Sequence, residues 1–82
     1  MNSDQQTVTV VVSALEHTVT VQCEPEGMEY EVPLGSHLRF QFTGLPPQEV
    51  EVSPAATGVV VLGRPAESVV RISDETGGEY QW

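Results

Sequence analysis

Residues 28–42 read Met-Glu-Tyr-Glu-Val-Pro-Leu-Gly-Ser-His-Leu-Arg-Phe-Gln-Phe, and this stretch decides the fold. Apolar and polar residues alternate strictly on both sides of a break that contains Pro33 and Gly35. Such alternation is typical of two half-buried β-strands joined by a turn. It predicts an all-β core built outward from a hairpin at this position.

The register of that hairpin follows from which residues share a face. All large apolar side chains gather on one side when three pairs face each other: Val32 and Leu38, Tyr30 and Phe40, and Met28 and Phe42. The same register places Glu31 opposite Arg39 on the other side. A shift of one residue would move every side chain to the wrong face.

Comparable alternating stretches recur along the whole chain, with Pro or Gly at nearly every break. The predicted strands are residues 7–12, 18–23, 28–32, 38–42, 49–53, 59–62, 69–73 and 79–82. Short strands at such regular spacing predict a small two-sheet antiparallel sandwich of immunoglobulin-like size with seven or eight strands; a small β-barrel is the alternative. We expect a single domain over residues 7–82 and a flexible N-terminal tail at residues 1–6.

The order of the first four strands has two interpretations. Side-chain parity allows a meander in which Val12 faces Val19 and Val21 faces Tyr30, with a turn at residues 24–27. Each of these connections could instead be an arch between the two sheets. The Pro-rich segment 43–48 is where we expect the chain to cross from one sheet to the other, and Ile72 is predicted to face Tyr80 in the last hairpin.

Composition limits the partners and the compartment. The 82 residues carry a net charge of −9, from twelve acidic residues against three basic ones. Such a charge repels phosphate, which argues against direct binding to nucleic acid or to an anionic membrane and favours a basic protein partner. The single Cys cannot form an intramolecular disulfide, and the N-terminus has no signal-peptide pattern, so we expect a cytoplasmic protein.

No set of residues predicts catalysis, a metal site or a cofactor. Cys23, His17 and His37 are the only candidates for a nucleophile and a base, and Cys23 falls on the inward face of its strand. Asp74 and Glu75 lie beside two glycines, but the ligand spacing of a calcium loop is absent. We therefore expect a protein that is not an enzyme.

Two surfaces are candidate binding sites. The outward carboxylates Glu29, Glu31, Glu49 and Glu51 form either a solvated face or a docking surface for a basic partner. The second surface is an apolar strip of Val60, Leu62 and Val69, which forms if the run 59–62 points its odd-numbered residues inward. The alternative is the opposite parity, or cover from the loop at residues 45–47. Trp82 is expected to close the open end of the core.

These features favour a non-enzymatic acidic β-sandwich module that acts through protein–protein interaction by binding or inhibiting a basic partner. The alternative is a structural subunit of a homomeric or phage-like assembly, in which the apolar strip mediates self-association. An inhibitor that imitates the charge of nucleic acid is a third interpretation.

Overall fold

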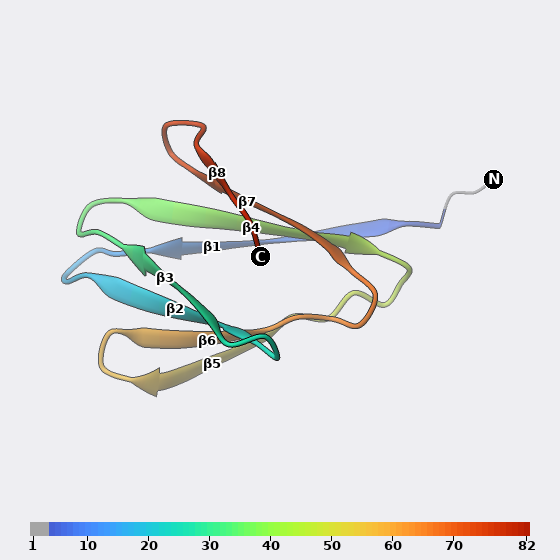
Figure 1. The fold of residues 1–82 in the computed structure, drawn as a ribbon, viewed down its shortest axis with the longest axis horizontal. Helices are drawn as coiled ribbons and strands as arrows, with labels where there is room; N and C mark the ends of the chain where they lie inside the picture. The colour runs from blue at the N-terminus through green and yellow to red at the C-terminus, as the bar shows by residue number, and fades with distance from the viewer. Residues whose placement is uncertain (1–3) are drawn as a thin grey trace.

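The computed structural model describes residues 4–82, which form eight strands and no helix (Figure 1). The strands are β1 Gln6–Ser13, β2 Val19–Glu24, β3 Met28–Val32, β4 His37–Gly44, β5 Glu51–Ala56, β6 Val59–Gly63, β7 Val69–Asp74 and β8 Glu79–Tyr80. The predicted tail of residues 1–6 overlaps β1 at Gln6, and residues 1–3 of that tail lie outside the described residues. Strand β5 begins two residues later than predicted.

The strands form two four-stranded sheets, ordered β1-β4-β7-β8 and β3-β2-β6-β5. Figure 1 shows them as two layers, with the β1-β4-β7-β8 sheet above the β3-β2-β6-β5 sheet in this view. The predicted all-β sandwich is confirmed, and the two sheets are not closed into the alternative barrel. β2 and β6 run parallel, which is the one departure from antiparallel pairing among the described strands.

The predicted hairpin between β3 and β4 is wrong. β3 pairs with β2, whereas β4 lies between β1 and β7 in the other sheet, so residues 33–36 form an arch across the core. Glu31 consequently faces Thr20 and not Arg39. The predicted pairing of Val12 with Val19 is wrong for the same reason, because β1 and β2 also belong to different sheets.

Other predicted connections are confirmed. Val21 faces Tyr30 in the β2–β3 hairpin, and Gly27 in its turn has a φ of 81°, a conformation that glycine adopts without a steric penalty. Ile72 faces Tyr80 in the β7–β8 hairpin. The Pro-rich segment after β4 carries the chain from the first sheet to the second, as predicted.

The core lies between the sheets and consists of the residues that alternate inward. Its fully buried large side chains are Phe40, Phe42, Leu62, Ile72, Val21, Val32 and Cys23. Full burial of a side chain of this kind stabilises the fold by roughly 1.5–3 kcal/mol. Tyr30, Met28 and Trp82 pack against this cluster from its margins. The inward face predicted for residues 28–42 is therefore correct although its strand pairing is not.

Candidate functional site

The outer side of the β3-β2-β6-β5 sheet is the surface on which carboxylates gather. Because side chains alternate along a strand, the inward positions of β2 and β3 fix which residues point outward. The outward residues of this sheet are Thr20, Gln22 and Glu24 on β2, Glu29 and Glu31 on β3, Val59 and Val61 on β6, and Glu51 and Ser53 on β5. We call this surface the acidic sheet face.

Strand register arranges these side chains in rows. One row runs from Glu29 through Gln22 and Val61 to Ser53. The Gln22 amide Nε2 donates a hydrogen bond of 3.0 Å to Glu29 Oε2, which orients that carboxylate. Since neighbouring strands lie about 4.8 Å apart, the face is roughly 14 Å wide, enough for one extended segment or one helix of a partner.

The acidic sheet face also has one carboxylate, Glu51, at its opposite edge. Glu51 on β5 faces Gly63 on β6, and a side chain at position 63 would meet the Glu51 Cβ at 3.1 Å. Glycine at this position therefore leaves room for the Glu51 side chain beside the strand. Glu49 is exposed but precedes β5, so it lies outside the strand ladder. Three of the four predicted acidic residues are thus on one sheet face, and the fourth is on the segment that enters it.

The centre of the face is apolar. Val59 and Val61 point outward from β6 and are partly buried, between the carboxylates of β3 and that of β5. These two residues and Gln22 were not among the site residues predicted from the sequence. The correctly predicted β2–β3 register would have placed Gln22 opposite Glu29. No sequence pattern predicts the orientation of the two valines, because the run 59–62 does not alternate.

The predicted apolar strip is wrong as a surface. Leu62 is fully buried, and Val60 packs against the core, so β6 has the parity opposite to the one assumed for the strip. Val69 is 68% exposed but belongs to β7 in the other sheet. Val52 faces the inward Leu62 across the β5–β6 ladder but is 53% exposed, because β5 is an edge strand. These residues do not form one patch.

Charge is segregated between the two sheets. Among the outward residues that the structure describes on the acidic sheet face, none is basic. Arg39 and Arg71 point outward from β4 and β7 on the opposite sheet, where Arg71 forms an ion pair of 2.8 Å with Glu79. Among the described residues, ion pairs join Arg64 to Glu26 and Arg71 to Glu79, and neither includes a carboxylate of the acidic sheet face.

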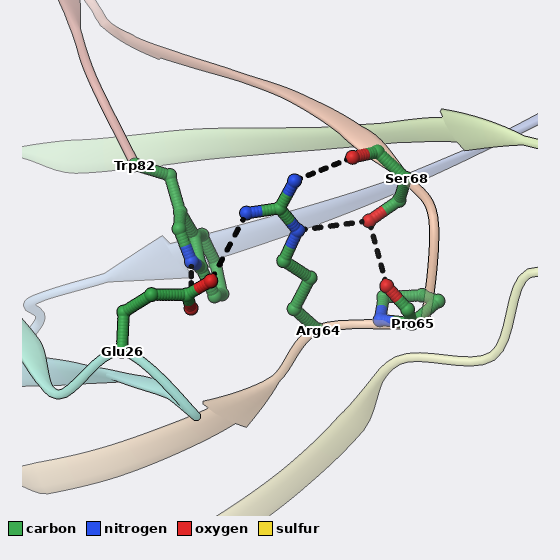
Figure 2. A network of polar contacts seen from close by, with 5 residues as sticks. All are labelled: Glu26, Arg64, Pro65, Ser68 and Trp82. Carbon is green, nitrogen blue, oxygen red and sulfur yellow. Dashed lines mark hydrogen bonds and ion pairs between the residues drawn. The ribbon is translucent and has the colours of Figure 1, made fainter.

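Arg64 follows the strand β6 but is held by a separate network (Figure 2). Its guanidinium contacts Glu26 at 3.3 Å, bonds to Ser68 through Nε and Nη2, and lies 5.9 Å from the centre of the Trp82 ring. Trp82 Nε1 donates to the other Glu26 oxygen at 2.8 Å, and this bond lowers the Glu26 pKa. Ser68 in turn donates to the Pro65 carbonyl oxygen. The network holds Trp82 in place and engages the Arg64 guanidinium with Glu26 and Ser68.

The candidate nucleophile and bases are not assembled. Cys23 is fully buried, and burial, with smaller contributions from nearby carboxylates, raises its pKa to about 12. His17 is exposed in the β1–β2 connection, and His37 begins β4. None of the hydrogen bonds of the described residues joins Cys23 to either histidine. The thiol therefore behaves as a small apolar core group.

The Asp74 carboxylate at the β7–β8 turn is hydrogen-bonded to residues of its own hairpin. Asp74 Oδ1 accepts bonds from Thr76 and from the Gly78 N–H, and Oδ2 accepts one of 2.7 Å from the Tyr80 hydroxyl. These bonds hold the Asp74 pKa well below its usual range. Within residues 4–82 no cluster of three or more His, Cys, Asp or Glu side chains is arranged to hold a metal ion.

Comparison with known proteins finds no matching family model, no matching curated protein and no matching solved structure. In the part of the chain that the structure describes, no helix has the length and apolar character needed to cross a bilayer. Function must therefore be inferred from the geometry of the chain itself.

Proposed function

We propose that this protein is a non-enzymatic interaction module whose acidic sheet face binds a basic protein partner. The observation that carries the proposal is the segregation of charge: Glu24, Glu29, Glu31 and Glu51 share one sheet face, whereas Arg39 and Arg71 point outward from the other. Surfaces of complementary charge steer association and set orientation.

The composition of the face supports protein recognition. Val59 and Val61 lie at the centre, and carboxylates flank them on both sides. An apolar centre with a polar rim is the usual anatomy of a protein interface. A basic segment with alternating apolar residues would place its aliphatic groups on the valines and its cations on the flanking carboxylates.

The same features argue against other ligands. The net charge of −9 repels nucleic acid phosphate and anionic lipid headgroups. The outer side of a sheet about 14 Å wide does not enclose a small molecule as a cleft does. We also propose a reducing compartment such as the cytoplasm, a proposal supported by the single free Cys23.

The test is an NMR titration with a synthetic peptide of alternating Lys and Leu at low salt. We expect amide shifts to concentrate at Gln22, Glu29, Val59 and Val61, and binding to weaken as salt is added. The double variant Glu29→Lys/Glu31→Lys should lose binding.

The matched control is Asp4→Lys/Glu16→Lys, which makes the same change in net charge at two exposed positions outside the strands. This control should bind the peptide almost as the unmodified protein does. Equal losses in both double variants, or shifts spread evenly over the surface, would show that net charge and not this face causes binding, and would overturn the proposal.

A further inference from the structure

The two sheets have four edge strands, and three of them are protected against pairing with another chain. β5 contains Pro54 and a register irregularity between Pro54 and Ala56. β3 is five residues long and alternates with Glu29 and Glu31, and β8 has only two residues. Proline, irregular register, charge and shortness are the devices by which proteins prevent edge-to-edge association.

Strand β1 has none of these devices. Its eight residues, Gln-Thr-Val-Thr-Val-Val-Val-Ser, contain no charge, proline or glycine. Its register with β4 is continuous from Gln6 to Ser13. Within residues 4–82 no strand pairs with its other side. Long, uncharged and β-branched, this edge is a template for a further strand.

The main-chain groups that face the open edge can be assigned. The Ala14 N–H donates to the Ser36 carbonyl oxygen at 3.1 Å, in register with the β1–β4 ladder. Bonded and non-bonded residues alternate in an antiparallel ladder, so the even-numbered residues of β1 bond to β4. The N–H and C=O groups of Thr7, Thr9, Val11 and Ser13 therefore point away from the sheet.

Side chains next to the open edge are also incompletely covered. Val8 and Val10 point inward but are only partly buried, in contrast to Val12, which is buried. On the outer side Val11 is 48% exposed. A strand added at this edge would cover aliphatic groups on both sides of the sheet.

We propose that two copies of this chain form a two-fold symmetric dimer by antiparallel pairing of β1 with β1. The strand is self-complementary: with Val10 facing its symmetry mate, Thr9 faces Val11 and Thr7 faces Ser13. All four open-edge residues then bond to the partner, and Val8 meets Val12 on the inner side. The β1-β4-β7-β8 sheets of the two copies then form one continuous sheet.

A second copy fits this edge better than a foreign strand of defined charge, because β1 carries no charge to select one. In a two-fold symmetric dimer the open β1 edge of each copy is paired with that of the other. The remaining edges, β3, β5 and β8, are the protected ones, so association stops at the dimer and does not continue into a filament. The interface uses a single strand from each copy, so we expect a weak dimer with a dissociation constant on the order of 10 μM.

Added salt should change the affinity of the dimer in the direction opposite to its effect on peptide binding at the acidic sheet face. Two copies that each carry a charge of −9 repel one another, and added salt screens this repulsion. Dimerisation should therefore strengthen with salt, whereas binding of a basic peptide weakens. The two inferences fail independently, because Glu29→Lys/Glu31→Lys leaves the β1 edge intact.

The test is sedimentation velocity from roughly 1 μM to 1 mM protein at low and high salt. We expect a concentration-dependent dimer that salt favours. Val11→Pro removes an N–H that faces the open edge while sparing the bonds to β4, so this variant should sediment as a folded monomer. Val11→Thr keeps the N–H and should still dimerise. A monomeric unmodified protein, or a dimeric Val11→Pro variant, overturns the proposal.

A second pair of variants decides the question if Val11→Pro fails to fold. Thr9 and Gln41 face each other on β1 and β4 and point to the same outer side, but only Thr9 lies at the open edge. A lysine at the edge opposes pairing, so Thr9→Lys should be at least about tenfold weaker as a dimer than Gln41→Lys. Equal dimerisation of these two variants overturns the proposal.

Discussion

The indole of Trp82, the last residue of the chain, lies edge-on to the ring of Phe42, with ring centroids 5.4 Å apart and planes at 80°. A second edge contact joins Trp82 to Phe40 at 6.2 Å. Both phenylalanines belong to β4, which lies in the interior of the first sheet. The C-terminal residue therefore closes the open end of the core, as the sequence predicted, and its N–H fastens it to Glu26 on the β2–β3 turn.

Loss of this aromatic cover should be measurable as loss of stability. Trp82→Ala removes the ring contacts and the hydrogen bond, and we expect the free energy of unfolding to fall by about 2–3 kcal/mol. Trp82→Phe keeps an aromatic ring but lacks the N–H, so its free energy of unfolding should fall by less. Urea unfolding followed by circular dichroism measures both variants, since no tryptophan remains to report. An unchanged Trp82→Ala midpoint would contradict the role of this residue in closing the core.

Asp74 should make the stability of the last hairpin depend on pH. Bonds from Thr76 and Tyr80 hold its pKa below the value in the unfolded chain. Its contribution to stability is therefore complete above the unfolded pKa of about 4 and is lost as the pH falls toward the folded pKa. Asp74→Asn should be less stable than the unmodified protein at pH 7, and the difference should narrow below about pH 4.

The comparison needs a control for net charge, because acidification also relieves the repulsion among carboxylates. Asp4→Asn removes the same charge from an exposed position before β1. The stability of Asp4→Asn should differ little from that of the unmodified protein at pH 7. If Asp4→Asn and Asp74→Asn follow the same pH dependence, the hydrogen bonds of Asp74 are not the cause.

Cys23 should be unreactive in the folded protein. Burial raises its pKa to about 12, with smaller effects from Glu26 and Glu24, so the reactive thiolate is scarce at pH 8. The side chain is also fully buried. We expect labelling by a disulfide reagent to be at least about a thousandfold slower in buffer than in guanidinium, because the reagent must wait for the sheet to open. Rapid labelling of the native protein would show that this end of the core is open.

The sequence predicted the inner face of the alternating strands but not all of the strand pairings, and the two results have one cause. Alternation requires Val32 and Leu38 both to point inward, whether their strands pair in one sheet or face each other across the core. The β2–β3 connection was predicted correctly because Pro25 and Gly27 form a tight turn. Residues 33–36 carry similar turn residues and yet form an arch, so local chemistry did not separate the two cases.

The acidic sheet face was predictable only where strands alternate. Glu29 and Glu31 occupy alternate positions of β3, and their outward direction follows from the pattern. β6 offers no such pattern, and its orientation depends on its parallel pairing with β2, a contact between distant parts of the chain. That pairing turns Leu62 inward beside Cys23, and it leaves Val61 outward beside Gln22.

The orientation of β6 can be tested with a matched pair of variants. Leu62 is fully buried, so Leu62→Ala should cost about 2–5 kcal/mol of a total stability of about 4–12 kcal/mol for a chain of this length. Val61 is the next residue, apolar as well, but it points outward, so Val61→Ala should cost under about 1 kcal/mol. Urea unfolding measures both differences, and the opposite order would mean that β6 has the other of the two parities that the sequence left open, with Val59 and Val61 facing the core. In that case Val61 would leave the acidic sheet face, and the apolar centre proposed for partner binding would be lost with it.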